Sequence, residues 1–278
     1  MSTINIDPVA FTIGPLAVRW YGIMVALAVV ALLAMTSREA KRLGISQDTI
    51  YNLFLWGIIG GLIVSRLVHV IDHVVTHPGE PIQLISFAGL SLLGAIGGAL
   101  LGAWIYTRVK KITWSSLAIV GDAVAVGAPV AQAIGRIGCA INGCCYGKPV
   151  SLPWAVIYAN PESACGLKGM PLHPTQIYFL LWNLVVFAVL WRMRKRIKPP
   201  GALFLFYLCL YAAGDFGLRF FRVNDVFLLG LYQGQVISLA ILAVVLPLFI
   251  IKMRRYRQES LKTESTNEVG QMGQSHEE

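Results

Sequence analysis

One arginine in a glycine-rich stretch, residues 135–147, carries the chemistry that this chain is best suited to do. Arg136 follows a long apolar segment, so we expect its guanidinium at the edge of the hydrocarbon. A guanidinium binds phosphate through two parallel N–H donors, and the glycines let backbone amides approach a ligand. We interpret the stretch as a polar loop that contacts a lipid headgroup, with Asn142 as a further donor. A plain turn between a span and an outer domain would leave the arginine unexplained.

The composition sets the class of protein. Of the 278 residues, 56% are hydrophobic and only 13% are charged, which is typical of a multi-span membrane protein. The net charge of +9 does not indicate nucleic acid, because the basic residues lie in short groups between apolar runs. Seven runs have the length that crosses a bilayer, and they predict an all-α membrane domain: about 16–35, 50–71, 84–106, 117–135, 175–191, 201–221 and 233–251.

The basic groups predict the orientation. They cluster near residues 38–42, 108–111, 192–198 and 252–262, in every second loop. The positive-inside rule then places the N-terminus outside and the C-terminus in the cytoplasm. Residues 1–252 form the membrane domain, with a small extracytoplasmic insert at about 136–174 between spans 4 and 5. Residues 253–278 form a polar cytoplasmic tail. The first run lacks the basic start and cleavage pattern of a signal peptide, so we expect a retained helix.

Two further patterns lie within the spans. Small residues recur at intervals that allow close helix packing, namely Gly57 and Gly61, then Gly94, Gly98 and Gly102. Charged residues within spans either pair or line a polar cavity. Arg66 and Asp122 have opposite charges, so an ion pair and a role in a site are both open; Asp215 is a third such residue.

Polar motifs open three spans on the outer side. Trp20 and Tyr21 begin the first; Trp20 fits an interfacial belt, whereas Tyr21 is a candidate for a site. His173 and Pro174 begin the fifth, and a histidine beside proline is either structural or catalytic. The seventh begins with residues 232–235.

In their order and spacing, these motifs resemble the bacterial prolipoprotein diacylglyceryl transferase family over about residues 6–252. The matching stretches are residues 13–15, 20–22, Arg66, Gly89, Ser91, Gly94, Asp122, Pro129, 135–136, 141–143, Gly147, 173–178 and 234–235. The resemblance implies transfer of the diacylglyceryl group from phosphatidylglycerol to the lipobox cysteine thiol in a prolipoprotein signal peptide, with release of glycerol 1-phosphate. It also implies no cofactor and a multi-pass protein of the bacterial inner membrane with its active site toward the outer leaflet.

The resemblance also implies site residues. Arg136 would bind the departing phosphate, and Tyr21 would assist deprotonation of the thiol, since only a few per cent of an ordinary thiol is thiolate at neutral pH. Tyr146 and His173 remain as other proton acceptors. Substrate would be bound by Arg136, Asn142, Gly143, Gly147, His173, Gln176, Arg66, Gln235 and Arg222. No metal site is expected, and the partners are membrane lipid and prolipoprotein.

The chain departs from the family pattern at several positions. Leu93 replaces a histidine, Cys139 an asparagine, Cys144 an acidic residue and Phe179 a glutamate, and Asp215 stands where an arginine is usual. Arg219 or Arg222 would then supply a second phosphate contact. A family member that only binds lipid or lipoprotein is the alternative function. A small-molecule transporter is a third hypothesis, although no internal repeat of hydropathy is evident.

Cysteines are concentrated in the outward-facing segment. Cys139, Cys144, Cys145 and Cys165 lie there, and Cys209 lies in a span. An oxidising exterior permits a disulfide between Cys165 and one of the other three. The spacing Cys-x4-Cys-Cys lacks the Cys-x2-Cys pairs of common zinc sites, which argues against a metal or a thioredoxin-like redox motif.

Overall fold

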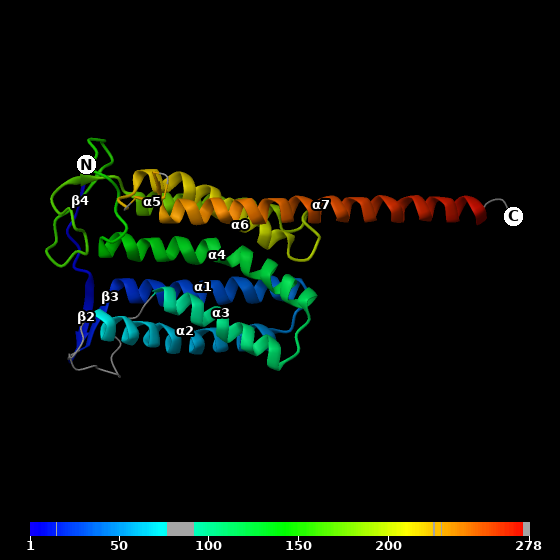
Figure 1. Ribbon diagram of the computed structural model, residues 1–278, viewed down its shortest axis with the longest axis horizontal. Coiled ribbons are helices and arrows are strands. Elements are labelled where there is room, and N and C mark those ends of the chain that lie inside the picture. The colour runs from blue at the N-terminus through cyan, green and yellow to red at the C-terminus, as the bar shows by residue number, and fades with distance from the viewer. Residues whose placement is uncertain (15, 77–91, 225, 229, 275–278) are drawn as a thin grey trace. The chain divides into compact units, whose positions relative to one another are not determined.

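The computed structural model describes residues 1–14, 16–76, 92–224, 226–228 and 230–274 (Figure 1). The chain divides into two compact units, Met1–Leu32 with Val124–Glu278 and Leu33–Ala123, and each is described by itself. Within the described residues, six helices are long and apolar enough to cross a membrane. The chain is therefore a mostly helical, multi-pass membrane protein. The count of seven spans stays a prediction, because residues 84–91 of the third predicted run lie outside the described part. The orientation also stays a prediction.

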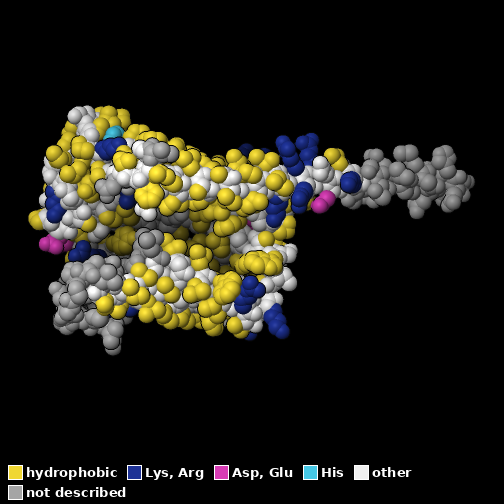
Figure 2. All heavy atoms as spheres, in the orientation of Figure 1, with side chains coloured by type: hydrophobic (Ala, Val, Ile, Leu, Met, Phe, Trp, Pro, Cys, Tyr) yellow, Lys and Arg dark blue, Asp and Glu magenta, His cyan; other side chains and the backbone are white. Residues whose placement is uncertain are grey.

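The helices follow the apolar runs because a backbone in hydrocarbon must satisfy its own hydrogen bonds. They are α1 Trp20–Arg42, α2 Gln47–Thr76, α3 Leu92–Val109, α4 Trp114–Asn142, α5 Thr175–Met193, α6 Ala202–Leu218 and α7 Gln233–Gln274, with a 3-10 turn η1 Arg219–Phe221 after α6. Figure 2 shows apolar side chains over the helical surfaces and a group of Lys and Arg on α7, where the sequence places residues 252–257. The polar tail continues α7 as a helix to Gln274.

Short strands lie outside the helices, so the all-α prediction is wrong in this detail. The N-terminal β1 Ser2–Ile4 pairs in parallel with β4 Val156–Tyr158, which pairs with β5 Pro171–Leu172. Two further pairs join β2 Val9–Ile13 to β3 Leu16–Arg19 and β6 Val226–Leu228 to β7 Leu231–Tyr232. Extended segments beyond the helices satisfy their backbone groups in this way. The β1–β4 pairing ties the N-terminus to the insert, so both lie at the same end of the bundle.

The predicted loop at residues 135–147 is wrong over its first half. The helix α4 continues to Asn142, so the insert begins at Gly143 and Arg136 lies on a helix. Gly138 fits this helix because α1 passes close by: an added Cβ would lie 2.9 Å from Met24 Cβ and 3.4 Å from Tyr21 Cα. The helix ends at Gly143, whose φ of 74° is the left-handed conformation that glycine adopts readily.

Close glycine packing between α2 and α3 confirms the interpretation of the small-residue pattern. An added Cβ on Gly98 would collide with the carbonyl oxygen of Gly60, and one on Gly102 with that of Trp56. A Cβ on Gly94 would lie 2.7 Å from the Cα of Ser65. The two backbones therefore approach so closely that only hydrogen fits between them, as in other tightly packed membrane helices.

We predict that Gly98→Ala destabilises the protein, because its methyl group must displace the α2 backbone. Overpacking of this kind costs about 1–3 kcal/mol, which thermal unfolding in detergent will detect as a lower midpoint. Gly97→Ala is the matched control, since no atom of the described residues lies within 4 Å of an added Cβ there. Equal midpoints for the two variants would contradict the close approach.

Candidate functional site

Arg136 has its hydrogen-bond donors available for a ligand. Its guanidinium carbon lies 4.3 Å from the ring centroid of Phe179 on α5, and that ring is buried. The arginine itself is half-buried, and in the described part of the chain no group accepts a hydrogen bond from it. An aromatic face stabilises a cation without using its N–H groups. The site therefore holds the Arg136 guanidinium near the end of α4, and none of the described residues uses its N–H donors.

A second guanidinium, that of Arg222, acts on the same thiol as Arg136. Arg222 follows η1 and forms an isolated backbone bridge with Gly147, and its buried Nε has no hydrogen-bond partner among the described residues. The neighbouring Cys139 and Cys144 thiols, and then the charges of Arg222 and Arg136, lower the pKa of Cys145. Because both guanidiniums lower the pKa of the same thiol, they contribute to one positive electrostatic field beyond the end of α4.

Arg219 has a different role from Arg222. Its Nε donates to Asp215 Oδ2 at 2.6 Å, and the Ser238 hydroxyl donates to the same oxygen at 2.8 Å. Asp215 is buried, so this pair compensates two charges inside the bundle. Of the two arginines predicted as a second phosphate contact, the geometry therefore favours Arg222.

Glycines in the loop after α4 serve close packing. A Cβ on Gly143 would collide with the Ser163 hydroxyl. A Cβ on Gly147 would lie 2.5 Å from His173 Cβ and 2.7 Å from the Phe221 carbonyl oxygen. The Gly147 amide donates to the His173 carbonyl at 3.1 Å. The structure gives these two glycines a packing role, and their predicted contact with substrate stays a prediction.

The start of α5 holds this loop in place. Thr175 Oγ1 donates to the Cys145 carbonyl at 2.7 Å, and Gln176 Nε2 donates to the Cys144 carbonyl at 2.8 Å. The same Gln176 amide reaches the Tyr158 hydroxyl at 3.1 Å, and its side chain is almost fully buried. The two polar side chains thus replace the hydrogen bonds that the loop carbonyls would otherwise make to water. Gln176 is a positioning residue in the structure, and its contact with substrate stays a prediction.

His173 is tied to aromatic neighbours. Its Nδ1 lies 3.2 Å from the Tyr178 hydroxyl, which accepts a hydrogen bond from Trp154 Nε1 at 2.9 Å, and its ring packs edge-on against Phe221. Burial lowers the pKa of His173, which favours the neutral imidazole. A neutral ring does not supply a further positive charge for phosphate, so any contact with substrate would be a hydrogen bond.

The other predicted site residues are dispersed. Tyr21, near the start of α1, lies against the last turns of α4, where an added Cβ on Gly138 would lie 3.4 Å from its Cα. Gln235 is fully buried; it donates to the Phe216 carbonyl at 3.2 Å and accepts from the Tyr232 amide at 3.1 Å. Asn142 is the last residue of α4, and its carbonyl accepts from the Ala164 amide at 2.9 Å.

Two groups of predictions are not tested by this geometry. Arg66 lies in α2, within the unit Leu33–Ala123, so its contact with substrate stays a prediction. Its pairing with Asp122 also stays a prediction. Gly89, Ser91 and the side chain of Leu93 lie outside the described residues.

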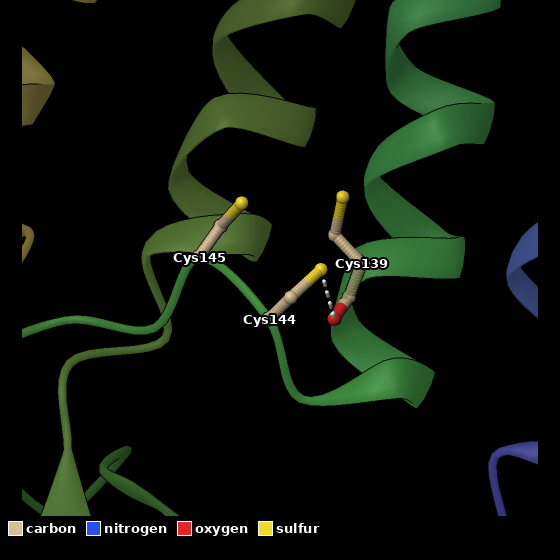
Figure 3. Close-up of side chains that lie close together, drawn as sticks. All are labelled: Cys139, Cys144 and Cys145. Carbon is tan, nitrogen blue, oxygen red and sulfur yellow. Dashed lines mark hydrogen bonds between the residues drawn. The ribbon is translucent and has the colours of Figure 1, made fainter. Parts of the chain in front are cut away.

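The cysteines do not form the predicted disulfide. All five are free thiols, and Cys165 lies apart in a buried cluster with Val156, Tyr158 and Leu172. Instead, the sulfur atoms of Cys139, Cys144 and Cys145 all lie within 4.8 Å of one another (Figure 3). The sequence indicated no common site for these three cysteines, because their Cys-x4-Cys-Cys spacing lacks Cys-x2-Cys pairs and because Cys139 was predicted to lie on a loop. A helix through Asn142 followed by a reversal at Gly143 would have indicated it.

Comparison with known proteins points to one family. A family model described as prolipoprotein diacylglyceryl transferase matches residues 8–251. A phosphatidylglycerol–prolipoprotein diacylglyceryl transferase of Dehalococcoides mccartyi is 42% identical over 264 residues, which cover 95% of this chain and 100% of the relative. One of the same name from Clostridioides difficile is 34% identical over 235 residues, 84% of this chain and 90% of the relative. A third, from Pseudoalteromonas atlantica, is 30% identical over 263 residues, 90% of this chain and 91% of the relative.

We predict that Gln176→Leu lowers stability by about 1–3 kcal/mol, because it leaves the Cys144 carbonyl without its donor. Thermal unfolding in detergent measures the loss, and Ile177→Ala, at an exposed neighbouring position, is the control. If Gln176→Leu keeps the unfolding midpoint but loses activity, the residue binds substrate and does not position the loop.

Proposed function

The chain belongs to the prolipoprotein diacylglyceryl transferase family, and we propose that it transfers the diacylglyceryl group of phosphatidylglycerol to the lipobox cysteine thiol of a prolipoprotein signal peptide. Glycerol 1-phosphate leaves. The observation that carries this proposal is the Arg136 guanidinium, which is supported by Phe179 and has no acceptor among the described residues. Its planar fork matches two phosphate oxygens.

The reaction needs a positive charge where the phosphate departs. The thiolate sulfur attacks the glyceryl carbon bonded to the phosphate oxygen, the C–S bond forms, and the C–O electron pair leaves with glycerol phosphate. Arg136 stabilises the charge that develops on this oxygen, and Arg222 adds a second charge beside it. Both guanidiniums are in place before the reaction, so no reorganisation is needed when the bond breaks.

The acceptor thiol must lose its proton. A free thiol has a pKa near 8.5, so the same positive field that binds phosphate also favours the thiolate. Tyr21 lies against Gly138 near the end of α4, where a phenol can pass the proton to solvent. We assign it this relay role.

The alternative, a member that binds lipid without catalysis, is not favoured. Two of the departures that motivated it have partners in the fold: Phe179 supports Arg136, and Asp215 binds Arg219 and Ser238. A relative with 42% identity over 95% of the chain carries the transferase name. These two departures from the family pattern therefore leave the Arg136 guanidinium available to bind a ligand.

We place the protein in the bacterial inner membrane with the N-terminus and the insert outside, and the site toward the outer leaflet. The alternating basic groups support this orientation. So does the β1–β4 pairing, which keeps the N-terminus and the insert at one end of the bundle.

We predict that Arg136→Lys lowers kcat on the order of 100-fold, because a point charge does not reproduce the two-donor fork. The assay uses purified protein, phosphatidylglycerol and a lipobox peptide, with the thioether product quantified. Arg255→Lys, an exposed change on α7, is the control. A wild-type rate for Arg136→Lys would exclude Arg136 as the phosphate-binding residue, and absence of product from the wild-type chain would refute the proposed function.

A second prediction concerns orientation. In a chain with Cys139, Cys144 and Cys145 changed to Ser, a membrane-impermeant maleimide will label Ser151→Cys in intact spheroplasts, because residue 151 is exposed on the insert. Ser260→Cys, exposed on α7, will react only after lysis. The reverse pattern would place the insert in the cytoplasm.

A further inference from the structure

Two buried hydrogen-bond donors lie on the segment that follows η1, and neither has a partner. The Nε of Arg222 and the Nδ2 of Asn224 are both shielded from solvent, and among the described residues no group accepts a hydrogen bond from either atom. Buried polar groups in folded proteins are nearly always hydrogen-bonded. Two unpaired donors so close together in the chain therefore indicate an acceptor that comes from outside the protein.

The segment is extended, which places the two side chains on the same side of it. Arg222 has a φ of −93° and a ψ of 148°. Side chains two residues apart on an extended chain point to one face. The exposure alternates in agreement with this: Phe221 and Val223 are 43% and 42% exposed, whereas Arg222 and Asn224 are half-buried. Arg222 and Asn224 thus share the face that is turned away from solvent.

Backbone pairing joins this segment to the loop after α4. Gly147 forms an antiparallel bridge with Arg222, and the next amide, that of Val223, donates to a carbonyl of the same loop at 3.4 Å. Residues opposite each other in an antiparallel pair have their side chains on one face. Gly147 has no side chain, so it leaves room on this face for the guanidinium and for a ligand. The pairing fixes both donors against the loop that follows Arg136 on α4.

We propose that Asn224 binds a hydroxyl of the phosphatidylglycerol headgroup and that this contact sets the preference of the site for that headgroup; the assignment rests on the proposed function. The phosphate already has two charged partners in Arg136 and Arg222. A neutral amide suits a hydroxyl, whose oxygen accepts a hydrogen bond from the N–H group. The Asn224 amide thereby gains the acceptor that the described residues do not provide.

The position of Asn224 fits a group beyond the phosphate. Two residues along an extended chain correspond to a displacement of about 6.6 Å, so the short asparagine side chain reaches a different part of the ligand from Arg222. In phosphatidylglycerol, the headgroup glycerol lies on the side of the phosphate away from the acyl chains. Asn224 follows Arg222 on a segment that leaves α6, so the order along the chain matches the order along the lipid.

Contacts to phosphate do not select a headgroup, because every phospholipid has a phosphate. The guanidiniums of Arg136 and Arg222 disfavour headgroups that carry a cation. They do not distinguish one anionic lipid from another, so this discrimination needs a contact to the group beyond the phosphate. A site that hydrogen-bonds a substrate hydroxyl rejects an analogue without it, because the polar group of the site is then left unpaired.

Equilibrium binding of short-chain lipids to the whole chain in detergent tests the assignment. The probes are dioctanoyl phosphatidylglycerol and dioctanoyl phosphatidylethanol, which has the same charge but no headgroup hydroxyl. We expect the wild-type protein to bind phosphatidylglycerol about two- to tenfold more tightly, as one neutral hydrogen bond allows. Asn224→Leu will remove this preference by weakening the binding of phosphatidylglycerol alone. Arg222→Gln, which removes a phosphate donor, will weaken the binding of both lipids alike.

The unfolding midpoint separates binding from a structural role. In the lipid-free protein, Asn224→Leu will leave the midpoint unchanged or raise it, because the buried wild-type amide has no partner among the described residues to lose. Val223→Ala, on the exposed face of the same segment, is the control and will keep the wild-type lipid preference. A lower midpoint for Asn224→Leu, together with weaker binding of both lipids, would make the residue structural and overturn the assignment.

Two other results would also overturn it. Equal affinity of the wild-type protein for the two lipids would exclude a contact with the headgroup hydroxyl. A preference that persists in Asn224→Leu would mean that the amide binds water instead of the headgroup. The binding assay requires no turnover, so a chain that shows the expected preference but forms no thioether product would refute the proposed transfer and retain the role of Asn224.

Discussion

Hydrogen bonding of the backbone at membrane depth is the constraint on which this site depends. In hydrocarbon an unpaired peptide group costs several kcal/mol, so α4 continues through Gly135 and Gly138 instead of opening into a loop. That continuation places Arg136 on a rigid element and lets α1 approach at Gly138. The helix ends only at Gly143, beyond which the insert supplies other partners for the backbone.

The polar residues after α4 divide into two roles. Thr175, Gln176 and Gln235 donate to backbone carbonyls, and Asp215 pairs with Arg219 inside the bundle. Arg136 and Arg222 are different, because they keep guanidinium groups that these contacts do not use up. A buried polar group that completes its hydrogen bonds stabilises one loop conformation. The ordered loop thereby keeps Arg136 and Arg222 in positions where they can bind an anion.

Much of the fold follows from the sequence because span length and apolar composition are strong signals. Six of the predicted runs correspond to helices that can cross a membrane, and the glycine spacing identified the α2–α3 contact. The end of α4 was misjudged because glycine is a loop residue in water but a packing residue in a membrane helix. The two- to five-residue strands have no hydropathy period long enough to be recognised. Arg136 was identified from its type, whereas its support by Phe179 required the tertiary contact between α4 and α5.

The same misjudged helix end explains why the sequence did not indicate how close the three thiols lie to one another. On a loop, Cys139 would have no fixed distance from Cys144. Because Cys139 instead lies on a helix and the chain reverses direction at Gly143, Cys139 faces the returning chain. The cluster and the proposed phosphate site are then both close to Arg136 and Arg222. With neutral thiols the two guanidiniums are fully available to an anion. Phosphate binding and thiolate binding are therefore compatible in one field, which is what transfer from a phosphate ester to a thiol requires.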